Sequence, residues 1–152
     1  MLRLSKLTDY GTVIMTFMAR DQDRVQSAQE VADQVGIALP TVSKVLKILC
    51  RYELVVSMRG ARGGYLLARP ASEITMAEII SAMEGTPLGL TECSSMPGVC
   101  VQERHCSIRG NWLRINHVIV QALEQVSLAE MARPVLQPIR IRERRDSGRA
   151  LA

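Results

Sequence analysis

Three cysteines, the residues of this chain most able to do chemistry, fall within one short segment, CSSMPGVCVQERHC. They are Cys93, Cys100 and Cys106, with the spacing C-x6-C-x5-C, and Cys50 lies far from them in the sequence. Three thiols can neither pair off completely nor fill a four-coordinate site. In a reducing compartment, clustered cysteines more often bind metal or do redox chemistry than form structural disulfides. The segment is therefore a candidate metal or redox site that needs a further donor.

The composition predicts a helical protein of one domain or two small ones. Hydrophobic residues make up 47% of the 152 residues but aromatic residues only 3%, so apolar packing depends on aliphatic side chains, which suits helices. The apolar stretch at residues 13–19 is too short for a membrane span, which needs about 20 residues, and it lacks the flanks of a signal peptide. We expect a cytoplasmic protein.

Charged residues are distributed unevenly along the chain. Residues 1–70 carry 10 Lys and Arg against 6 Asp and Glu (+4), residues 71–132 carry 3 against 7 (−4), and residues 133–152 carry 6 against 2 (+4). The three segments sum to the net charge of +4. A basic segment supports nucleic-acid binding when it coincides with a suitable structural motif.

The basic first segment predicts three successive helices. An amphipathic pattern follows Ser5, which is placed to cap the first helix. The second helix begins at Ser27, which forms a capping box with Glu30, and ends at Gly36. The third helix has Pro40 at its first position. Its expected buried face consists of Val42, Val45, Leu46 and Leu49.

The opposite face of the third helix has residue types that read DNA. Thr41 and Ser43 supply small hydroxyls that can reach base edges in the major groove. Lys44 and Lys47 supply ammonium groups that can neutralise phosphates. The alternative is that these residues form the ordinary solvated face of a surface helix.

A basic hairpin follows these helices. Two β-prone runs, LVVS and YLLA, flank the sequence RGARGG, whose glycines permit a tight turn. Arg59, Gly60 and Arg62 lie at the predicted tip. Three helices and a basic hairpin are the order of a winged helix-turn-helix, in which wing arginines contact the DNA backbone or minor groove. We therefore predict a DNA-binding domain.

The acidic middle segment predicts two helices on either side of the cysteines. Thr75 and Glu78 form a capping box for the first, which ends at Gly85. The second has an a/d seam that either joins two subunits or packs on the chain's own domain. Its members are Trp112, Ile115, Ile119, Ala122 and Val126. We favour a homodimer, because a small winged helix needs a second copy to read enough base pairs.

Together these patterns predict a mainly α fold in three parts. Residues 1–70 form a winged helix-turn-helix with a two-stranded wing. Residues 71–132 contain a helix, the cysteine loop and a long dimerisation helix. Residues 133–152 form a basic, disordered tail that could add nonspecific attraction to DNA.

Four segments together resemble the iron–sulfur cluster-binding winged-helix regulators of the IscR and NsrR type. They are LRLSKLTDYG, PTVSKVLK, RGARGGYLLARP and the three cysteines before a long helix, in order over residues 1–132. TECS running on to RGNW is most similar to regulators of the SUF cluster-assembly operon. The resemblance implies a homodimeric transcription factor, usually a repressor, in which a [2Fe-2S] or [4Fe-4S] cluster controls affinity for the operator.

The resemblance also implies the ligands. Cys93, Cys100 and Cys106 would be the thiolates, joined by one donor that is not cysteine, and Thr41, Ser43, Lys44, Lys47, Arg59, Gly60 and Arg62 would contact DNA. The first gap between cysteines is one residue longer than the family's usual pattern. Arg109 stands where members of the IscR type have a histidine, and arginine offers no lone pair.

The fourth ligand must then come from elsewhere in the chain. Members of the NsrR type use an aspartate of the first helix, and Asp9 is the matching residue here. In a dimer, Asp9 would approach the loop of the partner. His105 is the runner-up, and His117, Glu92 and Glu103 stay open.

Thiolate ligation suits iron–sulfur clusters, and a weaker fourth ligand leaves one iron open to substitution, as sensing of oxygen, nitric oxide or iron requires. Binding would order the loop and so fix the dimer helices. The distance and tilt between the two DNA-binding domains of the dimer, its reading heads, would then be fixed as well. A coupling of about 1–3 kcal/mol between cluster and operator is enough.

Alternatives of other classes stay open. The same donors could hold zinc, or the thiols could sense redox state by themselves. The chain could also be an iron–sulfur or thiol oxidoreductase, or a cluster scaffold without DNA contact. Because the sequence has no CxxC motif and no glycine-rich phosphate loop, we expect a regulator and not an enzyme, without a small-molecule substrate. Cys50 is expected to be a buried free thiol.

Overall fold

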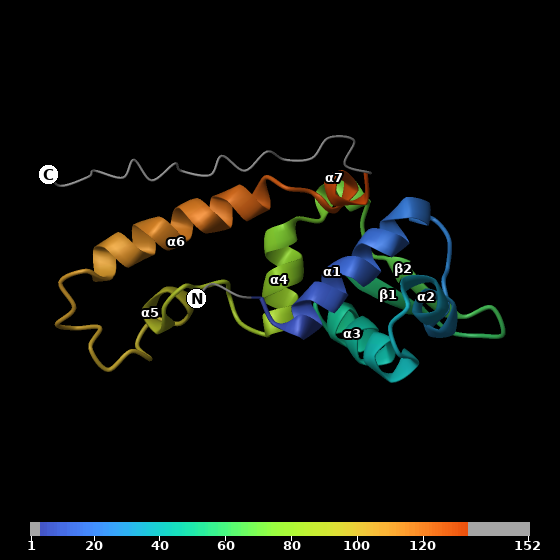
Figure 1. Ribbon diagram of the computed structural model, residues 1–152, viewed down its shortest axis with the longest axis horizontal. Helices are drawn as coiled ribbons and strands as arrows, with labels where there is room; N and C mark the ends of the chain where they lie inside the picture. The colour runs from blue at the N-terminus through green and yellow to red at the C-terminus, as the bar shows by residue number, and fades with distance from the viewer. Residues whose placement is uncertain (1–3, 134–152) are drawn as a thin grey trace, which may run out of the picture.

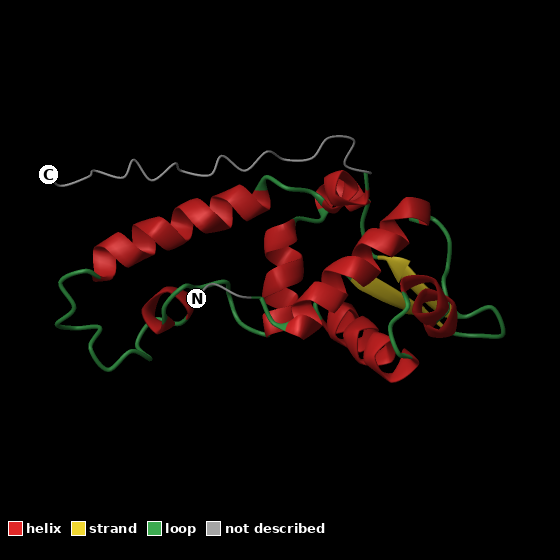
Figure 2. Cartoon of the chain, viewed as in Figure 1, coloured by secondary structure: helices red, strands yellow, loops and turns green. Residues whose placement is uncertain are grey.

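The computed structural model describes residues 4–133, so the predicted basic tail lies outside the described residues apart from Arg133. The described chain is mainly helical with one two-stranded sheet, as Figure 2 shows. In chain order the elements are α1 (Lys6–Met18), η1 (Ala19–Asp21), α2 (Ala28–Val35), α3 (Leu39–Arg51), β1 (Val55–Met58), β2 (Gly64–Leu67), η2 (Ala71–Glu73), α4 (Met76–Glu84), α5 (Glu92–Ser95), α6 (Arg109–Glu124) and α7 (Leu128–Ala132). The predicted winged helix-turn-helix is confirmed.

The ends of the first helices follow the expected capping chemistry with one exception. The Ser5 side chain accepts the N–H of Thr8 and caps α1. The Ser27 hydroxyl accepts the N–H of Glu30 at 3.1 Å, but the Glu30 carboxylate pairs with Arg24 and does not complete the capping box. Gly36 ends α2 in the left-handed region, with φ 69°.

The third helix packs as its periodicity predicts. The helix begins at Leu39, so Pro40 is its second residue and not its first as predicted. The second position also lies in the first turn, where a missing N–H is tolerated. The four residues of the predicted buried face are all 0% exposed: Val42, Val45, Leu46 and Leu49. Each such burial contributes about 1.5–3 kcal/mol to the free energy of unfolding. This face therefore fixes the position of α3 firmly in the core.

The wing is a short antiparallel hairpin held at its base. Val55 lies opposite Leu67, and Met58 lies opposite Gly64. The segment before α2 adds a bridge, in which the N–H of Gln26 donates to the carbonyl of Tyr65 at 2.9 Å and the N–H of Tyr65 donates back at 2.7 Å. A Cβ atom at Gly64 would lie 2.5 Å from the Gln26 carbonyl oxygen, so this approach requires glycine.

A second anchor joins the hairpin to the helix that follows it. Arg69, just after β2, donates to the Glu78 carboxylate at 2.7 Å and to the carbonyl of Glu73 at 3.1 Å. Glu78 also forms the predicted capping box with Thr75 at the start of α4. The wing base and the first turn of α4 therefore share one carboxylate.

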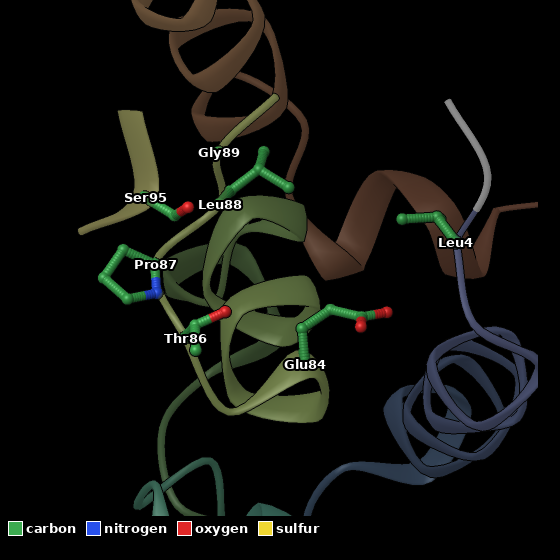
Figure 3. A pocket seen from close by; sticks show the side chains of 7 residues that line it. All are labelled: Leu4, Glu84, Thr86, Pro87, Leu88, Gly89 and Ser95. Atoms are coloured by element: carbon green, nitrogen blue, oxygen red, sulfur yellow. The ribbon is translucent and has the colours of Figure 1, made fainter. Parts of the chain in front are cut away.

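The helix α4 packs directly on α1 and α3 and continues the core of the winged helix. Gly11 of α1 faces Met83 of α4, and a Cβ atom at Gly11 would lie 2.7 Å from the Met83 Cγ atom. Glu84, the last residue of α4, accepts hydrogen bonds from the Thr8 hydroxyl and the Ser5 N–H. Figure 3 shows the Glu84 carboxylate directed toward the beginning of α1.

The helix α6 extends away from this core, on the side opposite the wing (Figure 1). It ends at Glu124, so Val126, predicted as a member of its seam, lies beyond the helix and packs on the core with Leu123. Among the remaining seam residues Ile115 is 43% exposed. Within residues 4–133, no helix combines the length and the apolar character that a membrane span needs.

The turn after α3 is strained, which leads to a stability prediction. Glu53 has φ 58°, and the N–H groups of Glu53 and Leu54 bond to the carbonyls of Cys50 and Leu49 in the usual left-handed helix end. A residue with a Cβ atom pays about 1 kcal/mol there. We expect Glu53→Gly to raise the free energy of unfolding by about 0.5–1 kcal/mol in urea denaturation. Glu53→Ala, which removes the charge but keeps the Cβ atom, should give no such gain, and equal effects of the two variants would contradict this explanation.

The carboxylate at the end of α4 gives a pH prediction. The Thr8 hydroxyl, assisted by the Ser5 N–H and opposed by partial burial, lowers the pKa of Glu84 below its ordinary value of about 4.3. A lowered pKa in the folded state adds stability above the unfolded pKa, and this stability is lost as the pH falls through the folded pKa. Between about pH 6 and pH 3, wild type should lose more unfolding free energy than Glu84→Gln. The exposed Glu124→Gln is the matched control, and a wild-type slope equal to that of Glu84→Gln would refute the assignment.

Candidate functional site

The outward face of α3 presents the residues predicted to contact DNA. Lys44 and Lys47 are exposed, and Thr41 and Ser43 are partly exposed beside them near the beginning of the helix. A shallow surface hollow of ≈ 570 Å³ runs along this face. It is lined by Pro40, Ser43, Lys44, Lys47, Ile48 and Arg51. The face therefore combines hydroxyls, cations and a small apolar floor, as a surface that enters a major groove does.

Arg51 was missed by the sequence analysis. It is exposed and lies four residues after Lys47, which itself lies three residues after Lys44. These three cations therefore form one row along the helix. The signal was present in the spacing of Lys44, Lys47 and Arg51, but the predicted face ended one turn too early. The extra cation extends the basic row to the last turn of α3.

The wing presents its basic residues away from the core. Arg59, Gly60 and Arg62 are all exposed in the turn between β1 and β2. In this turn the N–H of Gly63 donates to the Gly60 carbonyl at 3.0 Å, and Gly60 has φ 116°. The hairpin tip projects to one side of the helices in Figure 1. These positions fit contacts to a DNA backbone that runs past the end of α3.

The first cysteine of the loop is held inside the fold. Cys93 lies in α5, is 6% exposed, and its Sγ atom is 3.3 Å from the Thr91 hydroxyl oxygen. Thr91 and Ser94 form a capping box around it. This thiol is therefore packed and hydrogen-bonded, unlike the other two.

The second and third cysteines lie in successive turns without regular structure. Cys100 and Cys106 are partly exposed, and all four cysteines of the chain are free thiols. A hollow of ≈ 590 Å³ opens beside Cys100. Its lining residues are Gly98, Val99, Cys100, Val101, Glu103, Arg104 and Arg109. The hollow is thus lined by two guanidinium groups and one carboxylate.

Arg109 has a partner that explains its position. Two of its three guanidinium nitrogens, Nε and one Nη, donate to one oxygen of Glu103 at 3.0 and 2.7 Å. The other Glu103 oxygen accepts the N–H of Gly98 at 2.6 Å. The Gly98 N–H is the main cause that lowers the pKa of Glu103, against a desolvation effect and with help from Arg109. Glu103 is thus engaged on both oxygens, which makes it a poor choice for a metal ligand in this conformation.

The structure does not gather the predicted metal ligands. Within residues 4–133, no three His, Cys, Asp or Glu side chains lie close enough together to hold a metal ion. Cys93 is directed to Thr91, whereas Cys100 lines the hollow with the two arginines. The chemistry of the donor set nevertheless fits an iron–sulfur cluster, because three thiols share one loop and thiolates are the usual ligands of such clusters. Bringing the three thiols together requires a rearrangement of the cysteine loop.

The predicted fourth ligands lie at the surface. Asp9 is exposed on α1 and lines a groove of ≈ 460 Å³ together with Val13, Phe17 and Met131, and no cysteine lines this groove. His105 is exposed within the cysteine loop, next to Cys106. His117 is exposed on α6. That Asp9 serves the cysteine loop of a partner subunit stays a prediction.

Cys50 differs from the loop cysteines. It was expected to be buried, but it is partly exposed at the end of α3 and packs against the core. Burial raises the pKa of the Cys50 thiol, which keeps it protonated and weakly nucleophilic.

Comparison with known proteins places this architecture among regulators of transcription. The family described as "Rrf2: Iron-dependent Transcriptional regulator" matches residues 4–134. The chain is similar to BadM of Rhodopseudomonas palustris, named an HTH-type transcriptional regulator, with 31% identity over 97% of this chain and 92% of that protein.

Solved structures agree with this assignment. CymR of B. subtilis, named a global cysteine regulator, has a TM-score of 0.66 and 27% identity over 87% of this chain and 97% of that chain. IscR of T. potens has a TM-score of 0.65 and 27% identity over 86% of this chain and 85% of that chain.

Proposed function

Because the chain belongs to the Rrf2 family of transcriptional regulators, we propose that it is a homodimeric repressor whose affinity for its DNA operator is controlled by an iron–sulfur cluster on the cysteine loop. The genes it controls are proposed to be those of cluster assembly, of the SUF type. One observation carries the proposal: three thiols lie on a single polar loop that leads directly into α6, in a chain with a basic reading head. The similarity to T. potens IscR supports the same reading.

The reading head is proposed to work as follows. The beginning of α3 enters the major groove, where Thr41 and Ser43 reach base edges and the row of three cations neutralises phosphates. The wing, with Arg59 and Arg62, lies along the adjacent backbone. Affinity then depends strongly on salt, because each neutralised phosphate releases counterions.

The cysteine loop is proposed to hold the cofactor. Cys93, Cys100 and Cys106 would ligate the cluster, with Asp9 of the partner subunit, or else His105, as the fourth donor. The cluster supplies redox-sensitive iron that oxygen, nitric oxide or iron shortage can remove. The chain's own residues then determine how tightly the loop is ordered and how this order reaches α6.

The helix α6 is proposed to be the dimer contact. Its residues Ile115 and Val118 are 43% and 59% exposed, and Ile108 before it is 52% exposed. Exposed apolar side chains at helical spacing are costly in water and suit a second copy of the same helix. Ordering the loop would fix α6 and thereby the distance between two reading heads.

A second candidate is a regulator of another set of genes that responds to nitric oxide, to redox state or to a thiol signal through the cysteines themselves. The similarity to CymR, named a global cysteine regulator, is as strong as the similarity to IscR. The partly exposed Cys100 beside Arg104 and Arg109 supports this candidate.

The proposed row of phosphate contacts predicts the effect of charge removal. Lys44→Ala and Arg51→Ala should each weaken operator binding about 3–10-fold and reduce the slope of log K against log salt by about 1. Arg20→Ala removes the same charge from an exposed site outside α3 and the wing, and should leave both quantities unchanged. Fluorescence anisotropy over a salt series measures the slope. Equal effects of all three variants would mean that only net charge matters.

The cluster proposal predicts a coloured protein. Anaerobic purification should give a visible absorption spectrum with bound iron and sulfide, and Cys100→Ser should lose most of both. Cys50→Ser is the matched control and should keep the spectrum. A colourless protein with zinc would reject the cluster, and a colourless, metal-free protein with redox-dependent operator binding would favour the second candidate.

The fourth ligand can be tested on the same sample. Asp9→Ala should shorten the cluster's lifetime in air at least several-fold while circular dichroism of the metal-free protein stays unchanged. An unaltered lifetime would transfer the role to His105, which His105→Ala then tests.

A further inference from the structure

Asn116 is the one buried residue of α6. It is 9% exposed, whereas every other residue of this helix is partly or fully exposed. A buried amide costs free energy unless its donor and its acceptor are both paired. The hydrogen-bond partners of this side chain therefore explain why a polar residue occupies the only buried position of the helix.

Both partners belong to the main chain of one short segment. The Asn116 Oδ1 atom accepts the N–H of Leu90 at 3.0 Å, and its Nδ2 group donates to the carbonyl of Leu88 at 3.1 Å. The two bonds use the amide as a neighbouring strand would use a peptide group. They fix the orientation of the side chain and connect positions 26 and 28 residues apart in the sequence.

The same segment is also in close contact with α5. A Cβ atom at Gly89 would lie 2.4 Å from the Ser95 nitrogen and 2.7 Å from the Ser95 Cα atom, so the backbones are in close contact. Figure 3 shows Gly89 and Ser95 side by side at the edge of a pocket of ≈ 290 Å³. Residues 88–90 are therefore fixed between α5 and α6.

This segment leads into the first cysteine, and α6 follows the last. Leu90 is three residues before Cys93, and Cys106 is three residues before Arg109, where α6 begins. We propose that Asn116 is the positioning residue of the cysteine loop, which holds the arm of Cys93 at a fixed place on the helix that continues from Cys106. The proposal rests on the proposed function in one respect, the use of these thiols as the cofactor site.

The consequence for regulation is a direct connection between loop and dimer helix. Any movement that brings Cys93 toward Cys100 and Cys106 pulls on residues 88–90 and so on Asn116. Such a movement would therefore displace the middle of α6, where the exposed residues Ile115 and Val118 form the proposed dimer face. An apolar residue at position 116 could bury the same volume, but it could not hold the segment through hydrogen bonds.

The test uses the full-length, metal-free protein and the chain's own cysteines as probes. Asn116→Leu removes both hydrogen bonds, and Asn116→Asp keeps the volume but sets a carboxylate against the Leu88 carbonyl. Asn111, exposed on the same helix, provides the matched controls Asn111→Leu and Asn111→Asp. Alkylation of each cysteine by iodoacetamide is followed by mass spectrometry, and exchange of the Leu90 amide by NMR.

We expect both Asn116 variants to raise the alkylation rate of Cys93 about 10-fold or more, because the segment before it opens more readily once its hydrogen bonds are weakened. Asn116→Leu should also expose the Leu90 amide to exchange, whereas the carboxylate of Asn116→Asp can still accept that N–H. The rate at Cys50 should not change, and the Asn111 variants should behave as wild type. If Asn116→Leu unfolds the core, Asn116→Asp decides. Unchanged Cys93 and Leu90 in a folded Asn116 variant would overturn the proposal, as would equal acceleration at Cys50.

A second measurement separates this proposal from the function on which it rests. After anaerobic reconstitution with iron and sulfide, the Asn116 variants should lose the visible spectrum in air about 10-fold faster than the Asn111 controls. An equal rate in both would overturn the role in holding the cofactor. If the wild-type protein itself takes up no iron and sulfide, the proposed function fails, and the Cys93 and Leu90 measurements on metal-free protein still decide the positioning role.

Discussion

The close packing of α1 against α4 is the constraint on which the placement of both functional regions depends. At Gly11 and Met83 the two helices approach so closely that one added methyl group would overlap the methionine side chain. The helix α1 belongs to the core that orients the reading helix, and α4 leads to the cysteine loop. The reading helix α3 and the helix α4, up to Gly85, are therefore parts of one packed unit, and the cysteine loop begins beyond it.

The loop beyond that unit is built by a different kind of interaction. Its turns depend on main-chain hydrogen bonds, on the Glu103 carboxylate and on the amide of Asn116, while Val101 is 94% exposed. A typical hydrogen bond adds only about 0.5–1.5 kcal/mol net, whereas each fully buried apolar side chain of the core adds about 1.5–3 kcal/mol. A ligand of modest affinity can therefore reorganise residues 96–108 without disturbing α3 or the wing.

The sequence was informative wherever local periodicity or capping determines structure. The buried face of α3 followed from the spacing of its apolar residues. The ends of α2 and α4 followed from a hydroxyl residue before each helix and a glycine after it. The hairpin followed from two β-prone runs around a glycine-rich turn. Val126 was misassigned, because a heptad pattern carries no information about where α6 ends. Asn116 was missed since its partners lie far away in sequence, and the arrangement of the three thiols depends on contacts that no local pattern specifies.

The shared carboxylate of Glu78 has a mechanical consequence for the wing. Arg69 ties the base of the hairpin to the first turn of α4, while Arg59 and Arg62 stand at the free end. Because α4 packs on α1 in the same core as α3, this ion pair sets the direction of the hairpin relative to α3. The length of DNA that one subunit can span, from the groove at α3 to the backbone at the wing, would then be set by the fold and not by the DNA.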